Sequence, residues 1–339
     1  VASRNAQIDA IYDEIDTLLS ATFDVDDHVD LEALRRQVVH PPFASSHLVT
    51  PRPTPLPIPT PAPPVRIDPE PVKALLGKRK KAEAAAAAAD VAYAQAYAAW
   101  EVDMASLPER RQAAAHAHAA SEAQRLDQLK RAQAQYELEC AERDAEVAEH
   151  NSQLDSLIAG LGYGTVEAVE EYVTIVMANS AYPDHFPVDH SFEFDPMTAE
   201  LALRATIIGP DSFPSVKAWK YIKAKDELAP IEQSQKASRD RYAHTVAQVA
   251  LRSIHEVFEG DRRALIRSIA LEVGTETIHP ATGTSTYVPF VAVAADRRTF
   301  LSFDLSAVVP TATLDHLGAA VSKNPWTLTP ADTSGVRRT

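Results

Sequence analysis

Five basic and aromatic residues alternate along one short stretch of the chain and could contact a nucleic acid. They are Lys217, Trp219, Tyr221, Lys223 and Lys225. Alternate residues of a β-strand share one face, so a strand would present all five together. Lysines on such a face could neutralise phosphates while the aromatic rings stack on bases or sugars. The pattern also fits an edge strand whose lysines discourage aggregation and whose rings pack under a helix.

A magnesium-dependent nuclease site is the catalytic alternative for this region. PD-(D/E)xK nucleases hold the metal with an acid on the second strand of their core and an acid on the third, because the ion needs clustered oxygen ligands. Asp195 and Glu200 border the expected hairpin, but the third strand carries Ala218 where the other acid is required. The sequence therefore predicts no catalytic residue, and such a nuclease stays a second alternative.

Other chemical signatures do not form a site in the sequence. The chain has no GxSxG elbow and no Walker loop, and its single Cys140 excludes a CxxC zinc site and an intramolecular disulfide. His244 and His255 are three helical turns apart, too far to share a metal. The acidic run Asp24–Asp30 lacks the glycine and glutamate of an EF-hand loop, so it predicts a turn and a helix cap. We expect no metal and no cofactor.

The lysine-rich strand needs a sheet and a covering helix, and its neighbours provide both. The helix follows the strand, with a broad apolar face around Val249 and Ile254, and Gly260 stands where its C-terminal cap is expected. Alternating apolar residues predict a hairpin before the strand, turning at Asp195–Thr198, and further strands after the helix. The expected later elements are strands at 266–278, 287–294 and 300–305 and a helix at 311–321.

This order of elements predicts an α+β fold, helix-βββ-helix-ββ-helix, with a mixed sheet covered by helices on one face. The glycines at 160–164 end the preceding helix, and Thr165 caps the first helix of the fold. Composition divides the whole chain into five parts. They are short helices at 1–40 (the second at Leu31–Val38), a proline-rich polyproline-II linker at 41–72, long alanine-rich helices at 73–158, the α+β domain at 159–325 and a basic tail at 326–339.

The alanine-rich part has the pattern of a coiled coil. Apolar residues recur at three- and four-residue steps from Leu126 to Leu161, as in a diluted heptad seam. An earlier set, from Tyr93 to Leu107, is out of phase with it, and Pro108 lies between the two sets. A helical hairpin or one kinked helix, with the break near Ser106–Pro108, explains both facts. We expect self-association through these helices.

Charge and hydropathy limit the kinds of partner and the cellular location that this protein could have. The net charge of −14 argues against general nucleic-acid binding, so any DNA contact must come from a local basic patch. The sequence contains no apolar run of membrane-spanning length and no apolar core of a signal peptide. We expect a cytoplasmic protein that does not contact a membrane.

Several longer stretches together resemble the non-nuclease region of actinobacterial Mrr-like restriction-system proteins. They are VDDHVDLEALRR, HPPF, the proline tract, CAERDAEVAEHNSQLDSLI, YPDHFPV, SVKAWKYIKAKDE and RYAHTVAQVALRSIHEVFEGD. Longer relatives continue into a C-terminal Mrr nuclease domain with an aspartate and a Gln-x-Lys on adjacent strands. This sequence stops at Thr339, and we expect neither of those two catalytic elements in it. The resemblance implies a part in the restriction of foreign or modified DNA.

The resemblance and the residues together give one hypothesis and two alternatives. The hypothesis is a non-catalytic scaffold or sensor component of a DNA-restriction or phage-defence system, which assembles through its coiled coil and acts with DNA or a nuclease partner. The first alternative is a structural or protein-interaction protein without a DNA role. The second is the magnesium-dependent nuclease considered above.

Overall fold

The computed structural model describes residues 1–71 and 78–335. The chain divides into two compact units, the first made of Val1–Arg36 with Glu149–Thr339 and the second of Gln37–Ala148. The expected boundary between residues 72 and 73, and the arginines Arg337 and Arg338 of the expected tail, lie outside the described residues.

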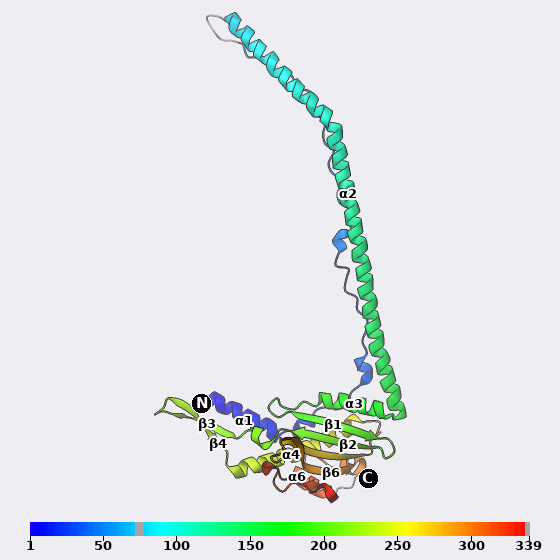
Figure 1. The fold of residues 1–339 in the computed structure, drawn as a ribbon, viewed down its shortest axis with the longest axis vertical. Helices are drawn as coiled ribbons and strands as arrows, with labels where there is room; N and C mark the ends of the chain where they lie inside the picture. The colour runs from blue at the N-terminus through cyan, green and yellow to red at the C-terminus, as the bar shows by residue number, and fades with distance from the viewer. Residues whose placement is uncertain (72–77, 336–339) are drawn as a thin grey trace. The chain divides into compact units, whose positions relative to one another are not determined.

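A five-stranded sheet forms the centre of the first unit (Figure 1). Its order is β1-β2-β5-β6-β7, with β2 and β5 parallel and the other neighbours antiparallel. The expected mixed sheet and the hairpin that turns at Asp195–Thr198 are therefore confirmed. The strands are β1 (Val188–Asp195), β2 (Glu200–Ile207), β5 (Ser268–Ile278), β6 (Ser285–Asp296) and β7 (Ala320–Val321).

Helices cover one face of this sheet, as the α+β prediction requires. Leu203 of β2 and Leu271 of β5 are buried under α3 (Val166–Asn179) and α4 (Gln235–Gly260). Arg204 and Glu272, the next residues along the two strands, line a hollow of about 690 Å³ on the opposite face. Alternating burial in the strands thus places the core between the sheet and the two helices.

Local capping residues set where the two covering helices begin. The side chain of Thr165 accepts a hydrogen bond from the backbone N–H of Ala168 at the start of α3, which confirms the expected cap. Ser234 does the same for Ala237 at the start of α4. Each cap satisfies a backbone donor that the helix itself leaves free.

The lysine-rich strand does not join the main sheet, which corrects the three-strand order. This strand, β3 (Val216–Ile222), pairs instead with β4 (Glu227–Glu232) in a separate two-stranded sheet. The sequence did not predict β4, because Pro230 lowers the strand preference of that segment. In a two-stranded sheet every strand has a free edge, so a proline without an N–H donor is tolerated there.

The C-terminal part departs from expectation in two places. Residues 300–305, expected as an edge strand, contain the end of the short helix α5 (Arg297–Phe300) and a turn, with Phe300 buried. The last helix, α6 (Pro310–His316), stops before Val321, and the chain then adds β7 to the sheet. Short apolar runs fit either a strand or a helix, and tertiary packing decides between them.

The N-terminal segment packs into the first unit. Helix α1 spans Ala2–Asp16 and buries Tyr12 and Ile15. The expected second helix, Leu31–Val38, is only a short 3-10 helix over Leu31–Leu34. Asp30 caps it by accepting a hydrogen bond from the N–H of Glu32, so the predicted cap is present although the helix is shorter.

One continuous helix, α2 (Lys78–Tyr163), forms the alanine-rich part, which confirms the alternative of a single kinked helix. The hairpin alternative is therefore wrong, because Pro108 lies inside α2. A proline removes one backbone hydrogen bond and bends a helix without necessarily ending it. Figure 1 shows α2 bending once in its cyan-to-green part. No helix of residues 1–71 and 78–335 has the length and apolar character needed to cross a membrane.

The proline tract of the second unit is extended apart from a short 3-10 helix at Ser46–Leu48 and its flanking turns, and it lies against α2. Tyr136 Oη donates to the carbonyl of Pro41, Trp100 Nε1 donates to that of Pro61, and Arg66 pairs with Asp90. Thus 25 residue steps along the tract, from Pro41 to Arg66, run beside 46 residue steps of the helix, from Tyr136 to Asp90. At 1.5 Å per helical residue this is about 2.8 Å per residue of the tract, close to polyproline II. The tract is therefore a strap on the helix, held by side chains of α2.

Candidate nucleic-acid interface

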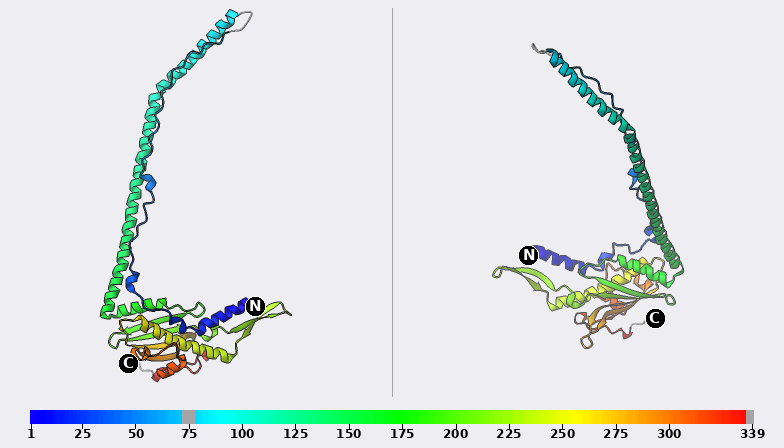
Figure 2. Two further views of the ribbon diagram at one scale, coloured as in Figure 1. Left: turned by 180° about the vertical axis from the view of Figure 1, so that it is seen from behind. Right: turned by 45° about the horizontal axis from the view of Figure 1, so that its top comes forward.

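The five predicted contact residues lie on the β3–β4 hairpin, but only three of them lie within a strand. Trp219 and Tyr221 alternate along β3, whereas Lys217 lies at a bulge between Val216 and Ala218 that interrupts the pairing with β4. Strand β3 ends at Ile222, so Lys223 and Lys225 belong to the turn that leads into β4. Figure 2 shows this hairpin next to the blue helix α1. The structure therefore places two lysines at the tip and one near the base.

Helix α1 holds the middle of β3. The side-chain amide of Asn5 accepts from the backbone N of Trp219 at 2.7 Å and donates to its carbonyl at 3.3 Å. Tyr12 Oη donates to the carbonyl of Val216 at 3.1 Å. An asparagine that satisfies both backbone groups of one residue replaces a neighbouring strand at that position. The hairpin thus has a fixed base although it lies outside the main sheet.

Trp219 is occupied by the protein itself. The guanidinium carbon of Arg4 lies 4.9 Å from the centre of its indole ring, within cation–π distance, and the side chain is half-buried. Trp219 therefore fits the edge-strand alternative, in which the aromatic rings of the strand pack under a helix. Arg4 and Asn5 were missed by the sequence reasoning, because nothing in their local spacing relates them to a strand 214 residues away.

Tyr221 is the aromatic residue that the hairpin exposes. Its side chain is 49% exposed, and its hydroxyl donates to the carboxylate of Asp226 across the turn. The hydrogen bond to Asp226 raises the pKa of the Tyr221 hydroxyl, so this group stays protonated at neutral pH. The bond fixes the ring beside the tip, which is the geometry that stacking on a base requires.

The exposed lysines of the hairpin differ in whether a carboxylate lies near their ammonium groups. Lys225 Nζ lies 3.7 Å from a carboxylate oxygen of Glu227, a separation at which an exposed pair is weak. Lys217 and Lys223 form no ion pair within residues 1–71 and 78–335. Lys220, on the other face of β3, is also exposed. The hairpin therefore offers ammonium groups for phosphates on both of its faces and at its tip.

The strand arrangement required by the nuclease alternative is not formed by β2 and β3. Strand β2 lies between β1 and β5, whereas Ala218 lies in the separate β3–β4 sheet. The Asp195 carboxylate accepts hydrogen bonds from the N–H of Met197 and the hydroxyl of Thr198, and the first of these is the main reason that its pKa is lowered. Asp195, the last residue of β1, thus stabilises the turn to β2.

Comparisons of this chain with protein-family models, with curated proteins and with solved structures give no match.

Proposed function

We propose that this chain is a non-catalytic scaffold or sensor component of a bacterial DNA-restriction system and that it contacts DNA through the β3–β4 hairpin. One observation carries the proposal: a basic hairpin is held at its base by α1, while its tip leaves Tyr221, Lys223 and Lys225 exposed. Lysines around one exposed ring suit a phosphate backbone with an accessible base or sugar. The restriction setting rests on the resemblance of the sequence stretches.

Self-association through α2 is the second part of the proposal. Val102, Leu126 and Leu138 are more than half exposed on this helix although the proline strap covers other residues of it. Apolar side chains left uncovered on a long helix favour pairing with another helix. A scaffold that pairs in this way would carry two hairpins.

A photo-crosslinking experiment tests the DNA contact at the hairpin itself. Tyr221→p-benzoylphenylalanine, irradiated with a labelled duplex of about 30 base pairs, should give a protein–DNA adduct. The same replacement at Met197 is the control, since this residue is 94% exposed on the turn between β1 and β2. An adduct of equal yield at both positions, or no adduct at Tyr221, would refute the proposed interface and favour a protein-interaction role.

A further inference from the structure

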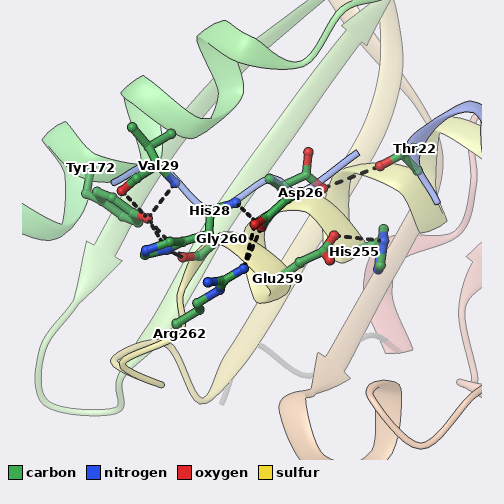
Figure 3. A network of polar contacts seen from close by, with 10 residues as sticks. Thr22, Asp26, His28, Val29, Tyr172, His255, Glu259, Gly260 and Arg262 are labelled. Atoms are coloured by element: carbon green, nitrogen blue, oxygen red, sulfur yellow. Dashed lines mark hydrogen bonds and ion pairs between the residues drawn. The ribbon is translucent and has the colours of Figure 1, made fainter. Parts of the chain in front are cut away.

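The loop that follows α1 crosses the C-terminal end of α4 and is held there by contacts of Asp26 and His28, the two neighbours of Asp27 in the sequence. Figure 3 shows the contacts of Asp26 and His28. On one side, both carboxylate oxygens of Asp26 accept from the guanidinium of Arg262 at 2.7 Å. On the other side, His28 Nδ1 lies 3.1 Å from the carbonyl of Gly260, and Tyr172 Oη bonds to the same carbonyl at 3.0 Å. Asp27 is thus held at a defined position above the last turns of α4.

Gly260 lets the loop approach α4 this closely. A Cβ atom at residue 260 would lie 3.0 Å from the methyl groups of Val176 and 3.3 Å from the carbonyl oxygen of Asp27. Sequence reasoning predicted this glycine as a helix cap, but Gly260 is the last residue of α4 and its φ is not positive. Its role is close packing, which brings the Asp27 backbone against the helix.

Three potential metal ligands meet at this crossing. His255 and Glu259 are one helical turn apart on α4, with Nε2 of the histidine 3.3 Å from Oε2 of the glutamate. Asp27 faces them from the loop, and one ligand atom from each residue lies within 4.8 Å of the other two. We propose that Asp27, His255 and Glu259 bind a divalent transition-metal ion.

The local charges favour a cation at this position. The two carboxylates carry two negative charges, which would balance a divalent ion bound also by a neutral imidazole. Within the described chain, no lysine or arginine pairs with Asp27 or Glu259. The nearby guanidinium groups are engaged elsewhere, that of Arg262 with Asp26 and that of Arg252 with Glu256. A bound cation would supply the missing positive charge.

Glu259 has a carboxylate oxygen that the protein leaves without a hydrogen bond. Its Oε2 atom is buried, yet it makes no hydrogen bond of good geometry with any group in the described residues. A buried carboxylate oxygen without a partner costs free energy, so such atoms are explained by a missing ion or water. The same oxygen lies 3.3 Å from Nε2 of His255, while the Glu259 side chain as a whole is 35% exposed.

The ligand types indicate which ions the site would take. One imidazole nitrogen and two carboxylate oxygens suit Zn²⁺ or Mn²⁺ better than Ca²⁺, which prefers oxygen ligands alone. Bonds of roughly 2.1 Å would bring the ligand atoms within about 4.2 Å of one another. The three ligand atoms lie within 4.8 Å of one another, so small side-chain rotations would be needed to reach that geometry. Three protein ligands would leave further positions for water.

The ion would connect two segments that are far apart in the sequence. Asp27 belongs to the N-terminal loop, whereas His255 and Glu259 belong to the helix that covers the sheet. Binding by the folded chain alone would stabilise it by mass action. This inference assigns ligand roles to His255 and to one member of the acidic run, for which the sequence predicted no metal. It does not depend on the proposed DNA contact.

Metal titration of the full chain tests the site. After treatment with a chelator and its removal, Zn²⁺ or Mn²⁺ should bind with one-to-one stoichiometry by calorimetry and raise the melting temperature. Asp27→Asn, His255→Gln and Glu259→Gln should each abolish that binding. Asp24→Asn and His244→Gln are the matched controls, because they make the same chemical changes on the same loop and helix.

Two results would overturn the proposal. One is binding that persists unchanged in Asp27→Asn and Glu259→Gln, which would place the ion elsewhere. The other is no binding to the parent chain, together with a higher melting temperature of Glu259→Gln, as expected if the two carboxyl groups share a proton. Circular dichroism of each metal-free variant verifies that α4 is folded, and electron paramagnetic resonance of Mn²⁺ gives a readout separate from stability.

Discussion

Arg252 and Glu256 form a buried ion pair on α4, with Nε of the arginine 2.7 Å from Oε1 of the glutamate. Their side chains are only 5% and 1% exposed. The same guanidinium donates to the carbonyls of Leu18 and Ala181, and its carbon lies 4.0 Å from the centre of the Tyr182 ring. One arginine therefore links α4 to the N-terminal segment and to the loop after α3.

Arg252→Met should destabilise the first unit strongly. Removing one partner leaves the other charge buried and uncompensated, which costs about 3–5 kcal/mol. Burial raises the pKa of Glu256 and Arg252 opposes that rise, so losing the arginine will drive this carboxyl toward its protonated form. Urea unfolding followed by tryptophan fluorescence measures the loss. Arg298→Met, at an exposed position, should change stability little, and an equal loss in both variants would contradict the assigned role of Arg252.

Asn5→Ala should release the β3–β4 hairpin from α1. The substitution removes the bond to the Trp219 N–H and the bond to its carbonyl, with an expected cost of about 1–2 kcal/mol. Hydrogen exchange of the Trp219 amide should accelerate, as should exchange at neighbouring amides of β3. Gln7→Ala removes an exposed amide of the same helix and serves as the control. Unchanged exchange in Asn5→Ala would show that α1 does not support the hairpin.

His190 should make stability fall in acid. Burial lowers the pKa of His190 to about 4, and the positive charge of Arg252 adds to this effect. Below pH 6.5 the unfolded chain takes up a proton that the folded chain refuses, so stability falls as the pH decreases from about 6.5 to about 4. The free energies of protonating His190 in the folded and in the unfolded chain differ by about 3 kcal/mol.

Unfolding free energies at pH 7 and pH 4 test this dependence. His190→Gln removes the titrating group while keeping a polar partner for Ser253, whose hydroxyl lies 3.1 Å from Nε2 of His190. The variant should lose about 3 kcal/mol less than the parent chain between the two pH values. His279→Gln, at an exposed turn, should retain the full dependence. Equal pH dependence of the parent chain and the His190→Gln variant would contradict a neutral His190 in the folded chain.

Arg125→Met should loosen the proline strap. Arg125 is buried, donates to the carbonyl of Leu48 and pairs with Glu122, which also accepts from the N–H of Arg52. Limited proteolysis should cut the segment around these strap residues faster in the variant. Arg131→Met removes an exposed arginine of the same helix and should leave the cleavage rate unchanged. Rapid cleavage of the parent chain at the same sites would mean that the strap is not held.

Residues near one another in the sequence allowed the core of this fold to be predicted. The alternation of Leu201 and Leu203 and the apolar face around Val249 and Ile254 give the hairpin and the covering helix, because each pattern reflects one buried surface. The alternation of apolar residues in a strand does not indicate which other strand pairs with it. The position of β3 outside the main sheet therefore could not be derived from its own residues.

The contacts that define the two sites are long-range, and local spacing does not reveal them. Asn5 and Trp219 meet across 214 residues, and Asp27 and His255 come from opposite parts of the chain. His255 and Glu259 have the i, i+4 spacing that places two ligands on one face of a helix. The sequence prediction considered His255 only together with His244, so it did not find this pair. The third ligand could be identified only from the folded chain.

The salt dependence of DNA binding by a charge-reversed hairpin tests the central claim most directly. Each phosphate neutralised contributes about 0.9 to the slope of log affinity against log salt concentration. Lys223→Glu with Lys225→Glu should weaken binding of a duplex and lower the slope by roughly 2. Lys80→Glu with Lys81→Glu makes the same change of charge on exposed residues of α2 and should keep the parent slope. Equal slopes for all three proteins would contradict DNA contact through the hairpin.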